Sequence, residues 1–273
     1  MTEDEAISDR LIQCLQHREQ IQPLSSGERG LSLAQSYRIS AQVTKAREAA
    51  GERAIGRKIG FTNRTIWDEY NVSAPIFGPM YDKTVHPLEQ EPFDLSGLLE
   101  PRIEPEIAFW LAHAPEPGMK PEDLIGCVSG ICAGFELVQS VFPSWKFEAA
   151  DTVAAFGLHG AFLHGPVHEF ALGDPQEWVQ QLASFRTTLR RNGEVMDEGP
   201  ASNVLGGGPL SALGHLAALV AEIEGARPLT PGEIVTTGTL TRALPISTGE
   251  TWRASFDGLS LEPIEISLTR QPS

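Results

Sequence analysis

The sequence is poor in cysteine and in positive charge. Three cysteines, Cys14, Cys127 and Cys132, stand among 273 residues, and none is in a C-x-x-C spacing. This excludes a disulfide framework and predicts reduced, packed thiols in an intracellular protein. Lys and Arg number 21 against 36 Asp and Glu, so that the formal net charge is −15. Such an acidic surplus argues against nucleic acid or an anionic membrane surface as a partner, because both require basic patches.

Long apolar runs and several catalytic fingerprints are also absent. No run approaches the roughly 18 apolar residues of a membrane span, and the first ten residues, MTEDEAISDR, are too acidic and polar for a signal peptide. The sequence contains neither a G-x-S-x-G nucleophile elbow nor a P-loop or dinucleotide-binding fingerprint. We therefore expect a soluble cytoplasmic protein that is neither a serine hydrolase nor a nucleotide-binding protein.

A change of pattern near residue 54 divides the sequence. Residues 5–20 and 32–51 carry apolar side chains at helical spacing, and Ser32 followed by Gln35 has the pattern of a capping box. Beyond residue 54, short apolar segments alternate with turn residues, as strands do. We predict an N-terminal helical arm over residues 1–53 and a larger catalytic domain over residues 54–273.

The larger domain is predicted to be α+β, with mixed or antiparallel sheet dominating. Strands are expected at 81–86 and 102–111, among others. Asn192-Gly193 between two strand-like runs is the strongest hairpin signal in the chain. Residues 209–224 form the one clear long helical pattern of the second half.

The stretch Arg102-Ile103-Glu104-Pro105-Glu106 places two carboxylates just before an apolar run. Side chains alternate along a strand, so Glu104 and Glu106 point to the same face. The pair is either a solvated ion pair at a strand mouth, with Arg102 as counter-ion, or part of a divalent-metal site. Pro105 cannot donate to a sheet ladder, which predicts that this end of the strand is an edge or a strand start.

Glu136, in Gly134-Phe135-Glu136-Leu137-Val138, is the third candidate ligand. A carboxylate in so apolar a strand is costly to bury unless it is paired or bound to a metal. One interpretation is a buried salt bridge to Lys58, Arg102 or Lys146. The other is a site of three carboxylates for a hard cation such as Mg²⁺ or Mn²⁺.

Lys58 and Asp82 are candidate catalytic residues. On a strand, Lys58 rises between Gly56 and Gly60, on a face with room for a ligand, although an exposed edge lysine fits the same pattern. Asp82 is either a turn residue or a group that orients the lysine. The glycine clusters at 206–208 and 237–239 are candidates for binding a carboxylate through backbone N–H groups. Metal-ligand spacing is absent from His86, His113, His159, His164, His168 and His215.

Motifs spread over nearly the whole chain resemble the hydratase/decarboxylase branch of the fumarylacetoacetate hydrolase superfamily. The resemblance rests on Gly56-Arg57-Lys58-Ile59-Gly60-Phe61-Thr62, on residues 72–78 with Asp82, on Arg102-Ile103-Glu104-Pro105-Glu106-Ile107-Ala108, on Glu136-Leu137-Val138, on Asp151-Thr152-Val153-Ala154, and on Pro231-Gly232-Glu233-Ile234-Val235-Thr236-Thr237-Gly238.

This resemblance implies a mixed β-sheet roll with flanking helices and a homo-oligomer. It implies Mg²⁺ (or Mn²⁺) held by Glu104, Glu106 and Glu136, and a Lys58–Asp82 catalytic pair. The substrate would be a small 2-oxo or 2-hydroxy carboxylate, converted through a metal-stabilised enolate. We expect the substrate to lie against Phe77, Ala155, Phe156, Leu158, Ser202 and Thr239.

One departure leaves the substrate open. Where relatives continue Asp-Asn-x-Ser after Asp151-Thr152-Val153-Ala154, this chain has Ala155, Phe156, Gly157 and Leu158. The expected activity is hydration of a 2-hydroxy-2,4-dienoate to a 4-hydroxy-2-oxo acid in aromatic-compound catabolism. The alternatives are decarboxylation of a 2-oxo-3-enedioate, C–C hydrolysis of an acylpyruvate, and a non-catalytic carboxylate-binding relative. Hydrolysis would require a base for water, and no clear His–Glu pair is visible in the sequence.

Overall fold

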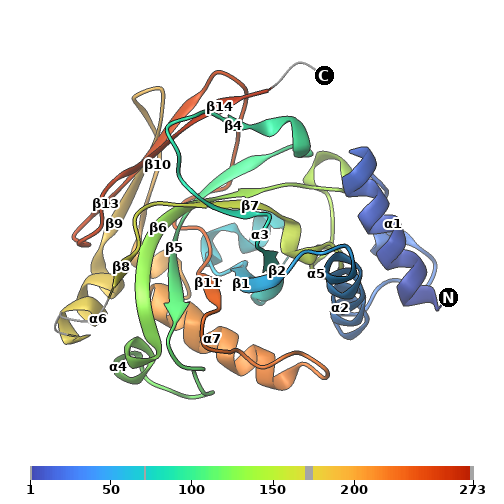
Figure 1. The fold of residues 1–273 in the computed structure, drawn as a ribbon, viewed down its shortest axis with the longest axis horizontal. Coiled ribbons are helices and arrows are strands. Elements are labelled where there is room, and N and C mark those ends of the chain that lie inside the picture. The colour runs from blue at the N-terminus through green and yellow to red at the C-terminus, as the bar shows by residue number, and fades with distance from the viewer. Residues whose placement is uncertain (1, 71, 170–174, 271–273) are drawn as a thin grey trace.

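Two β-sheets with flanking helices form the fold, which the computed structural model describes for residues 2–70, 72–169 and 175–270 (Figure 1). The larger sheet has nine strands among these residues, mixed in direction. Its main path runs in the order β2 (Ile76–Tyr81), β1 (Ala54–Gly60), β11 (Ile234–Thr236), β5 (Arg102–Leu111), β6 (Val128–Val138), β7 (His159–His164) and β3 (Val85–Pro87), with β12 (Leu244–Pro245) beside β5 and β8 (His168–Glu169) beside β6.

The smaller sheet has five described strands, and helices surround both sheets. Its order is β10 (Glu194–Pro200), β9 (Arg186–Arg191), β13 (Thr251–Asp257), β14 (Ile264–Thr269) and β4 (Phe93–Asp94). The α-helices are α1 (Glu3–His17), α2 (Leu33–Ala49), α3 (Trp67–Tyr70), α4 (Pro121–Leu124), α5 (Ala149–Ala154), α6 (Pro175–Ser184) and α7 (Pro209–Glu222). Single 3₁₀ turns are η1 (Leu24–Ser26), η2 (Arg64–Ile66), η3 (Leu95–Gly97), η4 (Ile125–Cys127), η5 (Pro143–Trp145), η6 (Phe156–Leu158) and η7 (Ala201–Asn203).

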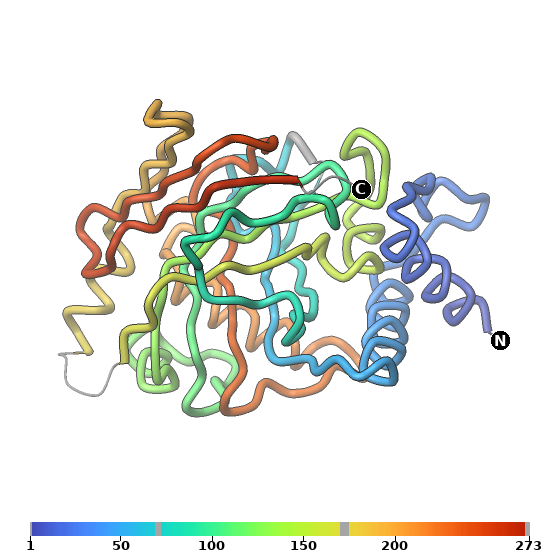
Figure 2. The backbone as a smooth tube through the Cα atoms, turned by 45° about the horizontal axis from the view of Figure 1, so that its top comes forward, coloured from blue at the N-terminus to red at the C-terminus, as the bar shows by residue number. Residues whose placement is uncertain are grey.

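The main core lies on one face of the curved larger sheet, where the smaller sheet and α7 cover it (Figures 1 and 2). On β5 this face carries Ile103, Ile107 and Phe109, all fully buried in that core. The alternate residues of β5, Glu104 and Glu106 among them, therefore point to the opposite face. The same strand thus supplies the core with one face and the candidate site with the other.

The N-terminal helices α1 and α2 pack together on the right of Figure 1 and share a second core with the segment around α5 and η6. Leu11 of α1 and Ile39 of α2 are fully buried there against Phe142 and Phe156. As expected, Ser32 caps α2 by accepting a hydrogen bond from the Gln35 backbone N–H. The Gln35 side chain, however, binds Asp4 of α1, so it joins the two helices.

Pro105 lies inside the larger sheet, and the expectation of an edge or strand start is wrong. Strand β5 is paired on one side with β6 throughout, including Pro105 with Phe135. On its other side, β12 pairs only up to Ile103 and β11 only from Ala108. The Pro105 carbonyl accepts from Leu240 on this second side. The missing proline N–H therefore faces an interruption of the ladder, where no strand requires it.

Two other local predictions are confirmed, and one is wrong. The hairpin at Asn192-Gly193 is confirmed, with φ of 50° and 87° joining β9 to β10. The long helix predicted over residues 209–224 is also confirmed, as α7. The single strand predicted over residues 81–86 is wrong, because β2 ends at Tyr81 and β3 begins at Val85.

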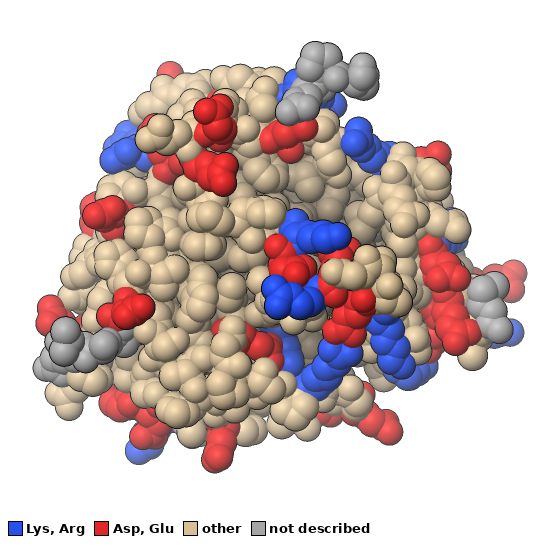
Figure 3. Space-filling model, viewed as in Figure 1, with Lys and Arg blue, Asp and Glu red and all other residues tan. Residues whose placement is uncertain are grey.

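The charge seen in the composition is distributed over the surface. Figure 3 shows acidic groups spread across the face viewed, with basic side chains interspersed near its centre. Among the described residues, none of the helices combines the length and the apolar character that crossing a bilayer requires.

The buried Asp151 joins α5 to Ser25 of η1, in the segment between α1 and α2. Its carboxylate accepts from the Ser25 backbone N–H (2.8 Å), the Ser25 hydroxyl (2.6 Å) and the Glu148 backbone N–H (2.8 Å). We expect Asp151→Ala to lower the free energy of unfolding by about 2 to 4 kcal/mol, because it leaves buried donors unpaired. Urea denaturation measures this loss.

The matched control is Asp9→Ala, at an exposed position of α1, which we expect to change the free energy of unfolding by less than about 0.5 kcal/mol. Equal stability of the two variants would show that the contacts of Asp151 with Ser25 and Glu148 do not stabilise the fold.

Candidate metal centre and active site

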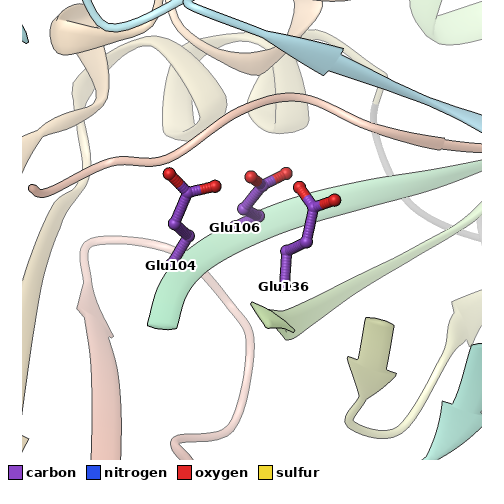
Figure 4. A group of neighbouring side chains, drawn as sticks. All are labelled: Glu104, Glu106 and Glu136. Atoms are coloured by element: carbon purple, nitrogen blue, oxygen red, sulfur yellow. The ribbon is translucent and has the colours of Figure 1, made fainter. Parts of the chain in front are cut away.

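Three carboxylates meet on the face of the larger sheet that is turned away from the main core. Glu104 lies directly opposite Glu136 in the antiparallel pairing of β5 with β6, and Glu106 lies two residues further along β5. Figure 4 shows the three side chains rising from these strands to the same side. One carboxylate oxygen from each lies within 4.8 Å of the others. The strand register thus brings the three carboxylates together, which residue spacing alone could not decide.

The carboxylate cluster is largely shielded from solvent. Glu106 and Glu136 are fully buried, and Glu104 borders a cavity. The Gly238 N–H donates to Glu106 Oε2 (2.9 Å), but Glu106 Oε1 has no hydrogen-bond partner within the described part of the chain. Buried polar atoms are rarely left without a partner. Among the described residues, Glu136 Oε2 also lacks a hydrogen bond but has Lys58 as an ion-pair partner. An oxygen-only donor set that includes the unpaired Glu106 Oε1 suits a hard divalent cation.

Lys58 is the cation beside this cluster. Strand β1 reaches β5 across β11, and Lys58 pairs with Thr236, which in turn pairs with Ala108. Its Nζ lies 3.1 Å from Glu136 Oε2 in a buried ion pair. Burial acts to lower the pKa of Lys58, but the three carboxylates, Glu136 foremost, outweigh it and raise the pKa above its ordinary value. Lys58 is therefore an ammonium group at neutral pH.

The carboxylates differ among themselves in acidity. Burial raises the pKa of Glu104 to about 7, and the charge of Glu136 adds to the rise while Lys58 opposes it. Burial and the two neighbouring carboxylates raise the pKa of Glu106 well above its ordinary range. Burial would raise the pKa of Glu136 too, but Lys58 and a hydrogen bond from His159 hold it below its ordinary value. Glu136 is thus the carboxylate that the protein keeps ionised by itself.

His159 is a site residue that the sequence did not indicate. Its Nδ1 lies 2.9 Å from Glu136 Oε1, and its Nε2 lies 2.9 Å from Thr84 Oγ1. It stands alone at the start of β7, without metal-ligand spacing, so only the register of β7 against β6 reveals it. The structure therefore does contain a His–Glu pair, contrary to expectation. Both of its ring nitrogens are engaged, which leaves no free nitrogen to activate water.

The cavity beside the carboxylates contains two of the predicted substrate residues, Leu158 and Thr239. Four others do not line it. The Phe77 ring stacks on Tyr37 at 4.7 Å between ring centres. Ser202 is exposed on η7. Ala155 and Phe156 are buried in the second core.

Asp82 is not brought to Lys58. It follows β2 and binds Arg53, with Oδ2 2.9 Å from Arg53 Nε and Oδ1 accepting from the Arg53 backbone N–H. Lys58 pairs with Gly78, four residues before Asp82, on the adjacent strand. The ion pair with Arg53 accounts for the position of Asp82, and Glu136 takes the place beside the lysine.

The η6 turn covers Lys58. Phe156, Gly157 and Leu158 all have positive φ (49°, 68° and 60°). A Cβ on Gly78 would come within 2.5 Å of the Phe156 carbonyl oxygen, and one on Gly157 within 2.9 Å of Lys58 Cδ. Glycine at both positions therefore lets the turn lie directly against the lysine stem, as side chains at these positions would not.

The remaining cavity wall is largely apolar and contains residues that the sequence did not indicate. Two aromatic residues, Trp145 and Phe147, follow β6 in the segment before α5. Trp145 is held by a hydrogen bond from its indole N–H to the Glu100 carbonyl (3.0 Å), and the Arg102 guanidinium stacks over its ring at 4.2 Å. Arg102 itself is not among the cavity-lining residues.

The chain is similar in sequence to known hydratases. A 2-hydroxyhexa-2,4-dienoate hydratase of Comamonas testosteroni is 30% identical over 269 residues, which cover 96% of this chain and 97% of that protein. A 2-hydroxypent-2,4-dienoate hydratase of Pseudomonas putida is 31% identical over 214 residues, covering 77% of this chain and 92% of that protein.

The fold is shared with a solved structure, 4-oxalocrotonate decarboxylase from Pseudomonas putida G7 complexed with magnesium and adipate. The two chains superpose with a TM-score of 0.87 over 98% of each, at 24% sequence identity. The α+β roll expected from the motifs is therefore confirmed. The model of the fumarylacetoacetate (FAA) hydrolase C-terminal family matches residues 83–262. The chain belongs to the fumarylacetoacetate hydrolase family.

Proposed function

We propose that this protein is a divalent-metal-dependent hydratase that converts a 2-hydroxy-2,4-dienoate to a 4-hydroxy-2-oxo acid in the breakdown of aromatic compounds. The observation that carries the proposal is the buried cluster of Glu104, Glu106 and Glu136 beside Lys58. The names of the two hydratases to which the chain is similar support the reaction class.

Glu104, Glu106 and Glu136 would hold Mg²⁺ or Mn²⁺. Their oxygens suit such an ion, and the unpartnered Glu106 Oε1 is an acceptor that a cation would satisfy. The related decarboxylase structure contains magnesium, which supports the same choice of metal. When bound, a divalent cation supplies Lewis-acid stabilisation of the negative charge that develops at the C2 oxygen of the substrate.

Lys58 would act on the substrate as an ammonium group. Its raised pKa keeps the proton on Nζ, which suits Lys58 to bind the substrate carboxylate. Donation of that proton to the carbon chain would require the bound cation to lower this pKa, because a proton donor works best when its pKa is near the operating pH. The apolar η6 turn against its stem keeps water away from the aliphatic part of the side chain. Gly238, in the loop after β11, donates its backbone N–H to Glu106 and so holds this carboxylate in place.

The charge of the cavity favours hydration over decarboxylation. Among the described residues that line the cavity, Lys58 alone is positively charged, and it is already paired with Glu136. A 2-oxo-3-enedioate would bring a second carboxylate into this cavity, whose described lining offers it no second cation. Burying an unpaired carboxylate is strongly unfavourable. A monocarboxylate with an apolar tail fits the same wall.

We also propose that the chain acts in the cytoplasm as a homo-oligomer. The three cysteines are free and buried, which fits a reducing compartment. Light scattering on the purified protein measures the number of subunits.

Metal binding is tested apart from catalysis by thermal unfolding. We expect Mg²⁺ to raise the unfolding temperature of the wild type, since a ligand at 100 times its Kd stabilises the folded state by about 2.7 kcal/mol. Glu106→Gln should abolish this rise, whereas Glu122→Gln, at an exposed position of α4, should retain it. A rise of the same size in all three proteins would exclude the carboxylate cluster as the metal site.

Catalysis is tested by the loss of dienol absorbance from 2-hydroxypenta-2,4-dienoate. We expect turnover with Mg²⁺, none with a chelator, and a fall in kcat of about 10² to 10⁴-fold in Lys58→Met, the range found for a lost proton-transfer group. Lys83→Met, at an exposed position, is the control. Chelator-resistant turnover, or full activity of Lys58→Met, would disprove the mechanism.

The apolar wall predicts which tail the substrate carries. For 2-hydroxyhexa-2,4-dienoate we expect kcat/KM to exceed that for 2-oxo-3-hexenedioate by at least about 10-fold, with no CO₂ released from the former. Asparagine tolerates the positive φ of position 158. Leu158→Asn should therefore preserve the turn while making the wall more polar, and should lower the ratio of the two kcat/KM values. A dicarboxylate turned over faster, with release of CO₂, would instead establish the decarboxylase alternative.

A further inference from the structure

His159 is fully enclosed, does not line the cavity, and nonetheless contacts one of the three carboxylates. We propose that His159, supported by Thr84, is a positioning residue that fixes the Glu136 carboxylate for cation binding. This inference rests on the proposed metal centre, and it assigns a role to a residue outside the catalytic groups identified above.

The two oxygens of Glu136 have separate partners. Oε1 faces His159 Nδ1 at 2.9 Å, and Oε2 faces Lys58 Nζ at 3.1 Å. A carboxylate gripped through one oxygen cannot rotate about its last bond without losing that hydrogen bond. His159 therefore fixes the plane of the Glu136 carboxylate, one oxygen of which lies within 4.8 Å of an oxygen of Glu104 and of Glu106.

The direction of the hydrogen bonds follows from the chemistry of the groups. An ionised carboxylate only accepts, so His159 Nδ1 carries the proton and donates it to Glu136. In a neutral ring Nε2 is then an acceptor, and the nearest donor is the Thr84 hydroxyl, 2.9 Å away. This arrangement sets both the tautomer and the plane of the imidazole ring.

Thr84 is itself held in the turn between β2 and β3. Its hydroxyl oxygen accepts from the Tyr81 backbone N–H (3.2 Å), and its one proton is shared between the Tyr81 carbonyl oxygen (3.0 Å) and His159 Nε2 (2.9 Å). Its own carbonyl accepts from the Phe162 backbone N–H on β7 (2.7 Å). The chain of contacts therefore ties the Glu136 carboxylate to a rigid turn from a different part of the sheet.

The backbone is shaped to bring His159 to this point. The pairing of β7 with β6 shifts register between Leu137 and Val138, and His159 pairs with Val138 after the shift. A Cβ on the next residue, Gly160, would lie 2.5 Å from the Leu137 carbonyl oxygen. Glycine there permits the close approach of the two strands that places the imidazole behind Glu136.

Residues that hydrogen-bond a metal ligand generally affect how tightly the metal binds. Groups that hydrogen-bond metal-ligating side chains orient them, and their loss typically lowers metal affinity about 10 to 100-fold. A histidine that merely filled space beneath the sheet would not have this effect. Metal affinity, measured without substrate, therefore distinguishes positioning from packing.

The experiment is calorimetric titration of Mn²⁺ into the wild type, His159→Leu, His159→Asn and the control His164→Leu. His164 lies on the same strand but hydrogen-bonds the Gly165 carbonyl, outside the site. We expect His159→Leu to weaken Mn²⁺ binding about 10 to 100-fold. The asparagine amide can donate from a position close to that of Nδ1, so His159→Asn should restore most of the affinity, and His164→Leu should leave it unchanged.

Affinity in His159→Leu equal to that of the wild type, or no recovery in His159→Asn, would overturn the positioning role. If His159→Leu does not fold, His159→Gln decides the question, because its amide reaches the position of Nε2 rather than Nδ1. We then expect weaker Mn²⁺ binding in the Gln variant than in the Asn variant, and equal binding would overturn the proposal. Failure of the wild type to bind Mn²⁺ would overturn the metal centre itself.

Discussion

The burial of three carboxylates beside a single lysine is the constraint on which this structure depends. Glu104, Glu106 and Glu136 lie close together, and Lys58 is the one cation among the described residues that line the cavity. Carboxylates this close repel one another and resist burial, as the raised pKa values of Glu104 and Glu106 show. The protein tolerates the arrangement because β5 and β6 are held in register by a large core on their opposite face.

The two faces of β5 and β6 therefore differ in polarity. One face supplies fully buried side chains such as Ile107 and Phe135 to the core. The other face carries the carboxylate cluster, of which Glu104 and Glu106 line the cavity. The interrupted ladder beside Pro105 admits the loop after β11, whose Gly238 N–H then holds Glu106. The proline and the hydrogen-bond donor are in this way two consequences of the same interruption.

Around this polar centre the protein places apolar groups. The η6 turn lies on the Lys58 stem, and Trp145, held by Glu100 and Arg102, forms part of the wall. An electrostatic site enclosed by apolar walls has a low local dielectric, which strengthens each charged contact inside it. His159 contacts the Glu136 carboxylate from outside the cavity, so the charged groups lie between the sheet and a hydrophobic cover.

Residue spacing and polarity determined the parts of this protein that depend on neighbours in the chain. The Glu104–Glu106 pair on one strand face, the anomalous charge of Glu136 in an apolar strand and the Asn192-Gly193 hairpin could all be predicted, because strand alternation and turn geometry are local. Tertiary structure alone decided that Asp82 pairs with Arg53, that Phe156 is buried in a core and that His159 meets Glu136. Each of these contacts depends on the register or packing of segments distant in sequence, which no local pattern encodes.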